Sequence, residues 1–248
     1  MLRQVEHVMG TAISLHVRDL PDPELAAAVF ASLREADRRF STYRPESEIS
    51  RLRRGELREE AASPDVRRVL ALCDDLQRTS DGYFDARGHR GDGLLDPSGL
   101  VKGWAVEEAA WLLEAAGVRH YALDAGGDVI VRGEPEVGRA WRIGLRHPHH
   151  ADRVTAVLSV GRGAVATSGA YERGAHIRDP HTGREAAGLL SITVVGPSLT
   201  YADAYATAAF AMGLEGLAWV ARHPGYGAYA CTLDGRAIWT DVTERYLA

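Results

Sequence analysis

Two oxygen-bearing side chains that lie four residues apart could hold a hard metal ion. The segment YADAYATAAFAMG, residues 201–213, is predicted to be helical, so Asp203 and Thr207 would share one helical face. A carboxylate and a hydroxyl supply part of the oxygen shell that Mg²⁺ uses when it also holds substrate phosphates. The structural alternative is a favourable negative charge in the first helical turn and a Thr207 hydroxyl bonded to the carbonyl of residue 203.

A second segment, LDPSGLVKGWA at residues 95–105, could bind an anion. Asp96, Ser98 and Gly99 are predicted to lie in a loop that leads into a helix, with Lys102 at the helix start. A glycine-rich approach to a helix N-terminus favours anions, whereas the helix dipole opposes a cation there. A bound phosphate would resolve this conflict, and the alternative is a surface lysine on a solvated turn.

The segment ATSGAYERGAHIRDPHTG, residues 166–183, contains a possible base. His176 could titrate near neutral pH and accept a proton during catalysis. Asp179 precedes a proline, which favours an extended backbone, and could orient the strand or the imidazole. The alternative is that DPHTG forms a turn that His176 caps.

Two weaker segments could contact a ring or a sugar. In DAGGDV, residues 124–129, paired glycines let the backbone approach a ligand, and Asp128 could bond to a ribose or a ring edge. The alternative is a hairpin turn, and the pattern is not the GxGxxG of a dinucleotide-binding fold. In FSTYRPESEISRL, residues 40–52, Tyr43 could stack on a flat ring, or the stretch could simply connect two helices.

Together and in order, eight segments resemble the ApbE family of FAD:protein FMN transferases. The segments are VMGT (8–11), FSTYRPESEISRL (40–52), GYFD (82–85), LDPSGLVKGWA (95–105), GGD (126–128), ATSGAYER (166–173), HIRDPHTG (176–183) and ADAYATAAFAMG (202–213). They span residues 8–213, so the resemblance covers nearly the whole chain. HIRDPHTG and ADAYATAAFAMG are specific when found together in this order.

The resemblance implies a Mg²⁺-dependent enzyme that cleaves FAD, passes the FMN half to a Thr or Ser hydroxyl of an acceptor flavoprotein, and releases AMP. His176 is then the candidate base near the phosphorus under attack. The implied metal ligands are the side chains of Asp203 and Thr207 and the backbone carbonyls of Gly99 and Ala206. The implied FAD contacts are Met9, Tyr43, Phe84, Asp85, Asp96, Lys102 and Ile177.

Three residues depart from the usual pattern of that family. Arg53 and Asp124 stand where Asn is common, and Glu107 stands where Asp is usual. Arg53 and Asp124 could shift the balance from transfer to plain hydrolysis of FAD. The alternatives are therefore an FAD pyrophosphatase that yields FMN and AMP, and a non-catalytic flavin-binding protein.

Positioning these segments requires a mixed set of helices and strands. Periodicity predicts a strand over 5–17, a helix over 23–40 that begins at Asp22 and Pro23, and a second helix from residue 64 that closes near Gly82. A loop over 85–101, a helix over 103–116 and a strand–turn–strand around the Gly-Gly-Asp turn follow. Further strands are predicted at 141–146, 154–160, 163–168, 189–195 and on both sides of Asp234–Gly235, with helices at 201–212 and 215–222.

This order does not alternate strictly between strand and helix, so it predicts an α+β fold with a largely antiparallel sheet and flanking helices. The resemblance implies an ApbE-like architecture related to the T-fold. No linker or repeat divides the chain. We expect one domain over residues 1–248, and the alternative is a domain built as two interlocked lobes.

Composition excludes several classes of protein. The 248 residues carry a formal net charge of −5, which argues against a nucleic-acid partner. No apolar run could cross a membrane, and the N-terminus has no export signal, so we expect a cytoplasmic protein. Cys73 and Cys231 are expected to be buried, reduced thiols. His147, His149 and His150 resemble metal ligands, but we expect them to be solvent-exposed in a polar connection.

Overall fold

The computed structural model describes residues 1–88, 93–150, 152–169 and 177–248. Within them, eight strands form one sheet in the order β1-β2-β3-β4-β7-β8-β9-β10, with antiparallel neighbours throughout. The strands are β1 (Leu2–Val8), β2 (Thr11–Val17), β3 (Tyr121–Ala125), β4 (Asp128–Arg132), β7 (Arg162–Gly169), β8 (Leu189–Gly196), β9 (Gly227–Thr232) and β10 (Ala237–Trp239). A separate antiparallel pair contains β5 (Trp141–Arg146) and β6 (Val154–Val160). The predicted α+β class is confirmed.

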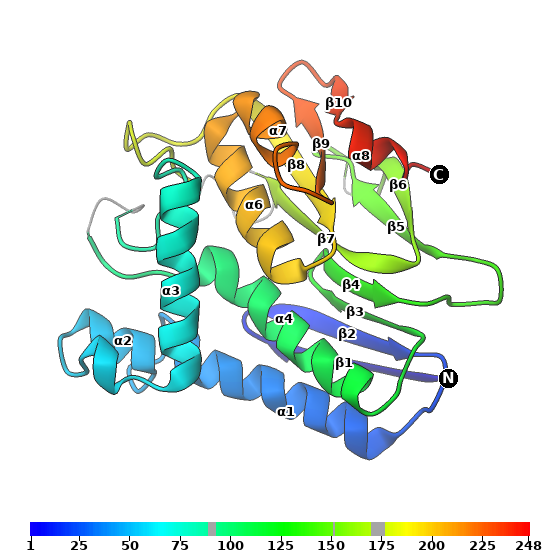
Figure 1. Ribbon diagram of the computed structural model, residues 1–248, viewed down its shortest axis with the longest axis horizontal. Helices are drawn as coiled ribbons and strands as arrows, with labels where there is room; N and C mark the ends of the chain where they lie inside the picture. Colours follow the sequence, from blue (N-terminus) through cyan, green and yellow to red (C-terminus); the bar gives the residue numbers. More distant parts are fainter. Residues whose placement is uncertain (89–92, 151, 170–176) are drawn as a thin grey trace.

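Most of the helices lie on one face of the main sheet, and the β5–β6 pair and the last short helix lie on the other face (Figure 1). The helices are α1 (Pro23–Phe40), α2 (Glu48–Arg53), α3 (Pro64–Thr79), α4 (Ser98–Ala115), α6 (Leu199–Met212), α7 (Glu215–Val220) and α8 (Asp241–Glu244), with a 3₁₀ turn at Glu59–Ala61. The largest apolar core lies between the helices and the sheet. A smaller core, which includes Leu145, Leu158 and Val165, lies under the β5–β6 pair.

The two cores explain why a central strand is apolar at almost every position. On β4, Ile130 faces the helices, whereas Val129 and Val131 face the β5–β6 pair. All five residues of β4 are buried as a result. A strand covered on both faces reads as a continuous apolar run instead of an alternating one.

Side-chain caps fix the starts of the first two helices, and α1 begins where the sequence predicted it. Asp22 accepts a hydrogen bond from the backbone N–H of Glu24 at 2.9 Å, and Pro23 occupies the first helical position. Ser47 accepts from the backbone N–H of Ser50 at 3.0 Å and starts α2. The predicted helix over 23–40 is confirmed at both ends.

Two predicted elements differ from the structure. The strand predicted over 5–17 is a hairpin, because Met9 and Gly10 adopt φ values of 55° and 74° and turn the chain between β1 and β2. The helix predicted from residue 103 begins at Ser98, so the predicted 85–101 loop is too long. The side chain of Asp96 accepts from the backbone N–H of Ser98 at 3.1 Å, which favours this earlier start.

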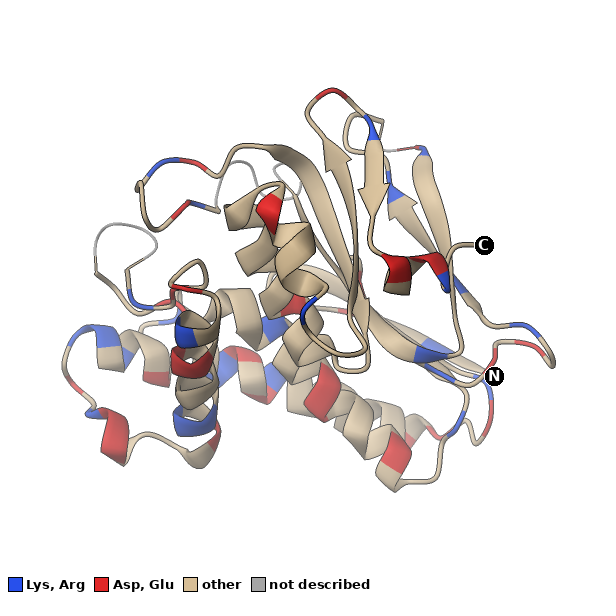
Figure 2. Ribbon diagram, turned by 45° about the horizontal axis from the view of Figure 1, so that its top comes forward, with Lys and Arg blue, Asp and Glu red and all other residues tan. Residues whose placement is uncertain are grey.

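Acidic and basic residues lie side by side on the outer helices (Figure 2). Arg39, for example, pairs with Glu35 on α1 and with Asp65 on α3. No helix in the described part of the chain has the length and apolarity that a bilayer span requires.

Candidate active site

The crossing of α4 and α6 brings together residues that are 100 positions apart in the sequence. The backbone N–H of Gly103 donates to Asp203 Oδ2 at 2.8 Å. One turn earlier on α4, a Cβ added at Gly99 would lie 3.2 Å from Thr207 Cγ2 and 3.4 Å from Thr207 Oγ1. The structure therefore places the predicted metal positions Gly99, Asp203 and Thr207 at one helix crossing. Ala206 is buried on the same helix.

The structural alternative for Asp203 is wrong. Helix α6 begins at Leu199, two residues earlier than predicted, and its first turn holds no acidic residue. Asp203 is 5% exposed and lies one turn inside the helix. A buried carboxylate needs strong partners, and the backbone N–H of Gly103 is one of them.

The loop before α4 is held by Arg53. Its Nε donates to the carbonyl of Leu95, and its Nη2 lies 3.6 Å from Asp96 Oδ2. Asp96 is buried and its Oδ1 accepts from both the backbone N–H and the hydroxyl of Ser98. Phe84 is buried beside Gly99, since an added Cβ there would lie 3.3 Å from Phe84 Cε2. Arg53 thus fixes the chain that carries Asp96 into α4.

Lys102 is balanced by a carboxylate that lies on the sheet. Its Nζ lies 2.6 Å from Asp128 Oδ2, and the Asp128 side chain is 1% exposed. The other oxygen of Asp128 accepts from the backbone N–H of Thr167 at 3.2 Å. The prediction that Lys102 lies at the helix start is wrong, because it is the fifth residue of α4. The predicted hairpin turn at Gly126–Gly127 is confirmed, and Asp128 connects it with α4 and β7.

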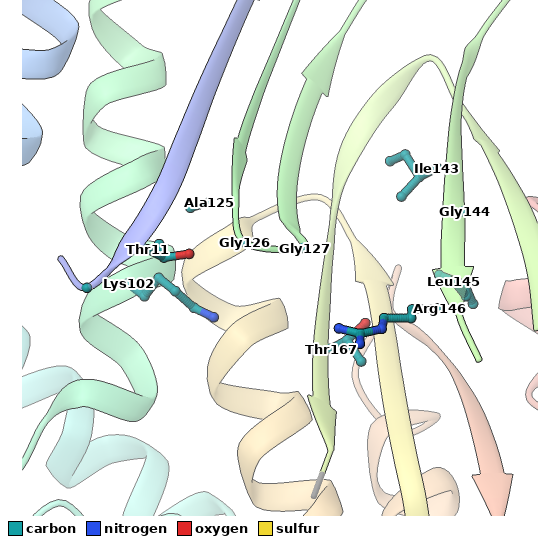
Figure 3. Close-up of a pocket in the computed structure, with 11 residues that line it drawn as sticks. Thr11, Lys102, Ala125, Gly126, Gly127, Ile143, Gly144, Leu145, Arg146 and Thr167 are labelled. Atoms are coloured by element: carbon teal, nitrogen blue, oxygen red, sulfur yellow. The ribbon is translucent and has the colours of Figure 1, made fainter. Parts of the chain in front are cut away.

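A cavity of about 310 Å³ opens beside Lys102 (Figure 3). It lies between the main sheet and β5. Its lining residues are Gly10, Thr11, Lys102, Ala125, Gly126, Gly127, Ile143, Gly144, Leu145, Arg146 and Thr167. Of these, Lys102, the Gly-Gly turn, Gly10, Thr11 and Thr167 lie in segments that the sequence had already singled out. The β5 residues carried no motif, since their position depends on how the β5–β6 pair packs on the sheet.

The remaining predicted flavin contacts differ in how deeply they are buried. Met9 forms the β1–β2 turn and packs on the main core, next to the cavity residues Gly10 and Thr11. Ile177 also packs on that core. Tyr43 is 87% exposed. Asp85 accepts from the backbone N–H of Arg87 at 2.7 Å.

The predicted base His176 lies outside the described residues. The DPHTG segment that follows it is a turn, as the structural alternative held: Asp179 accepts from the backbone N–H of His181 at 2.9 Å and from the hydroxyl of Thr182 at 3.0 Å. The ring of His181 lies 4.6 Å from that of Tyr83. This contact joins the turn to the GYFD segment.

The other histidines and the cysteines carry no predicted chemistry. His149 and His150 are exposed and His147 is half-buried. Among the described residues, no three His, Cys, Asp or Glu side chains are arranged to hold a metal ion. Both cysteines are free and buried, as expected, and burial raises the pKa of Cys73 to about 12.

Glu107 joins α4 to the start of α6. Its Oε2 accepts from the hydroxyl of Ser198 at 2.7 Å, from the backbone N–H of Thr200 at 3.0 Å, and from the Thr200 hydroxyl. A carboxylate at a helix N-terminus satisfies free N–H groups and complements the helix dipole. In the sequence, Glu107 stands out only as a departure from the family pattern, because its partners lie more than 90 positions away.

We expect Glu107→Gln to lower the free energy of unfolding by about 1–2 kcal/mol, because an amide replaces the charge at the start of α6. Urea denaturation would measure this change. Glu108→Gln is the matched control: Glu108 pairs with Arg68 at the surface, 3.2 Å away, and such pairs contribute less than about 1 kcal/mol. Equal losses in the two variants would contradict the capping role.

Asp124 carries a charge that the fold disfavours. Burial raises its pKa above the ordinary 3.8, and nearby Asp128 raises it further, against a hydrogen bond from the backbone N–H of Gly127. The ionised form is thus less stable in the folded protein than in the unfolded chain. This penalty is complete above the folded pKa and absent below the unfolded pKa.

We expect Asp124→Asn to raise the melting temperature at pH 7, because an amide oxygen can still accept from Gly127 without the buried charge. The gain should shrink as the pH falls toward 3.8. Asp234→Asn is the control with the opposite sign, since the hydroxyl of Thr232 lowers the pKa of Asp234. Calorimetric scans across pH would check both variants. A gain in melting temperature for Asp124→Asn that does not depend on pH would contradict the inference that the charge of Asp124 destabilises the folded protein.

Solved structures share this architecture along the whole chain. A flavin transferase ApbE from Vibrio cholerae is 24% identical, with 99% of each chain covered and a TM-score of 0.86. An ApbE protein from Thermotoga maritima is 21% identical, with a TM-score of 0.85 over 100% of this chain and 99% of that one. The antiparallel sheet with helices on one face is therefore the ApbE fold.

The ApbE family model matches residues 9–89 and 87–230, and the chain belongs to the ApbE family. An FAD:protein FMN transferase of Escherichia coli strain K12 is 30% identical over 165 residues, which are 62% of this chain and 47% of that protein. One from Vibrio cholerae is 35% identical over 131 residues, 49% of this chain and 39% of that protein. The chain thus matches about half the length of these curated relatives or less.

Proposed function

We propose that this protein is a Mg²⁺-dependent transferase that moves the FMN part of FAD to a Thr or Ser hydroxyl of an acceptor flavoprotein. The observation that carries the proposal is the α4–α6 crossing, where Gly99, Asp203 and Thr207 meet beside the cavity that Lys102 lines. The curated relatives carry the name of this activity.

The residues at the crossing fit a hard cation. Asp203 supplies a buried carboxylate, Thr207 a hydroxyl, and Gly99 and Ala206 backbone carbonyls, all of them oxygen donors of the kind that Mg²⁺ prefers. A methyl group at Gly99 would crowd Thr207, so the missing side chain keeps two donor positions close. When bound, Mg²⁺ would neutralise charge on the diphosphate.

In the proposed reaction, the acceptor hydroxyl attacks the phosphorus atom on the FMN side of the diphosphate. The bond between that phosphorus and the bridging oxygen breaks, a phosphoester bond to the acceptor forms, and AMP leaves. The hydroxyl proton passes to a base, for which we propose His176. Phosphoryl transfer depends mainly on positioning and charge neutralisation; Lys102 would place a positive charge beside the diphosphate.

The remaining predicted contacts complete the proposed FAD site. Met9 and Ile177 pack on the main core and offer apolar surface, while the exposed ring of Tyr43 is available for stacking on the flavin. Phe84, Asp85 and Asp96 would hold the loop side of the ligand.

Incubation with FAD, Mg²⁺ and a candidate flavoprotein tests the proposal, with mass spectrometry of the acceptor as the readout. We expect the acceptor to gain the mass of FMN and AMP to be released in equal amount. Release of FMN and AMP without labelled acceptor would identify an FAD pyrophosphatase. Bound FAD that survives Mg²⁺ and acceptor unchanged would identify a flavin-binding protein. An unchanged rate and pH dependence in His176→Ala would reject the proposed base.

A further inference from the structure

Two ion pairs of opposite polarity join helix α4 to strand β4. Lys102 of α4 pairs with Asp128 of β4 at 2.6 Å, and Glu114 of α4 pairs with Arg132 of β4 at 2.8 Å. On α4 the two pairs are more than three turns apart, which is about 18 Å along the helix. Lys102 lines the cavity, so the first pair combines a contact between helix and sheet with a place at the proposed active site.

Asp128 is fixed from two strands before it meets Lys102. It is the first residue of β4 and lies opposite Ala125 of β3, across the Gly126–Gly127 turn. Its side chain is 1% exposed, and its Oδ1 accepts from the backbone N–H of Thr167 on β7 at 3.2 Å. The carboxylate is therefore a rigid partner for an ammonium group.

The stem of Lys102 does not by itself define where its charge lies. A lysine ammonium is a point charge on a flexible four-carbon chain, so its location depends on the contacts that it makes. Figure 3 shows Lys102 extending from α4 toward the strand that carries Thr167. Asp128 thus contacts residues on two walls of the cavity, while its own side chain is buried. An ammonium has three N–H donors, so the contact with Asp128 is compatible with a contact to a phosphate.

We propose that Asp128 is a positioning residue, which holds the ammonium of Lys102 where the diphosphate of FAD reacts. This inference rests on the proposed function, because it takes FMN transfer as the reaction. Asp128 also offsets the charge of Lys102, so the pair is not arranged for the tightest binding of an anion. Its contribution is orientation, which lowers the barrier of a phosphoryl transfer without strengthening the binding of the substrate.

The test compares Asp128→Asn with Glu114→Gln, since each variant removes the carboxylate from one of the two pairs. We expect Asp128→Asn to lower kcat for FMN transfer roughly 10- to 100-fold, because a displacement of about 1 Å can cost that much. The KM for FAD should stay the same or fall, because a negative charge beside the cavity is lost. Glu114→Gln also breaks a contact between α4 and β4, but it should keep both kcat and KM. Equal losses of kcat in the two variants would show a general role in packing and would overturn the inference.

A double-mutant cycle with Lys102→Met shows whether Asp128 acts through Lys102. The loss of kcat from Asp128→Asn should largely disappear when Lys102 is already replaced, and a loss of the same size in both backgrounds would overturn the inference. Melting temperatures measured without FAD test the ion pair itself. The double variant should melt above Lys102→Met, because the single variant leaves a buried carboxylate without its ammonium. A double variant that melts no higher would contradict the pair on which the inference rests.

The same measurements separate this inference from the proposed function. If the unchanged protein does not transfer FMN, the proposed function fails and this inference fails with it. Transfer at the same rate by the unchanged protein and by Asp128→Asn rejects only the role of Asp128.

Discussion

We expect Asp203→Asn to reduce covalent FMN transfer roughly a thousandfold, because a metal that neutralises transition-state charge contributes several kcal/mol. Asn has the shape of Asp and can still accept from the backbone N–H of Gly103, which Asp203 does at 2.8 Å. The substitution therefore removes the charge while it preserves the contact between the helices. The rate of flavin attachment to the acceptor, followed by mass spectrometry, measures the effect.

Two controls separate loss of the metal from loss of the fold. Glu215→Gln removes an exposed carboxylate from the adjacent helix α7 and should leave the transfer rate unchanged. Titration with Mn²⁺, detected by its paramagnetic resonance signal, should show binding to the unchanged protein and to Glu215→Gln but not to Asp203→Asn. Transfer at the normal rate by folded Asp203→Asn would reject the metal site, whatever the role of the cavity.

The sequence was most informative where a residue pattern and the structure that it predicts lie within the same helix or turn. Helix α1 begins at Asp22 and Pro23, as the sequence predicted. Asp203 and Thr207, whose spacing predicted one helix, both lie on α6. In each case the relevant partners lie within a few residues, so local propensity and helical period decide the outcome. The Asp234–Gly235 hairpin between β9 and β10 was predicted for the same reason.

The sequence was least informative where partners meet only in the folded chain. Arg53 reaches the carbonyl of Leu95, and Lys102 reaches Asp128, but neither pairing has a local pattern. Arg53 was therefore seen only as a departure from a family pattern. Arg146 had no signal at all, since its place at the cavity depends on the packing of a second sheet.

The close approach of α4 and α6 depends on a glycine. A Cβ at Gly103 would lie 2.5 Å from the carbonyl oxygen of Leu199 and 2.8 Å from Asp203 Cβ. Real Cβ atoms essentially never come within 3.0 Å of such atoms, and the carbonyl belongs to backbone in the first turn of α6. The two helices would have to move apart, and the hydrogen bond from Gly103 to Asp203 would lengthen.

We expect Gly103→Ala to lower the free energy of unfolding by about 2–3 kcal/mol, the usual cost of overpacking a tight core. It should also slow FMN transfer, because Asp203 and Thr207 move away from Gly99. The sign of the change in stability is informative. In a helix interior without such a neighbour, the same substitution stabilises a protein by about 1 kcal/mol, so a loss can only come from the crowded crossing.

Denaturant melts of Gly103→Ala beside Gly161→Ala measure the effect. Gly161 lies between β6 and β7, and a Cβ there would meet nothing within 4 Å, so its substitution should change stability little. A stabilised Gly103→Ala would mean that α4 and α6 do not approach this closely. A destabilised variant that still transfers FMN at the normal rate would show that the spacing of the two helices does not govern the reaction, and the metal ligands would then have to be sought on one helix alone.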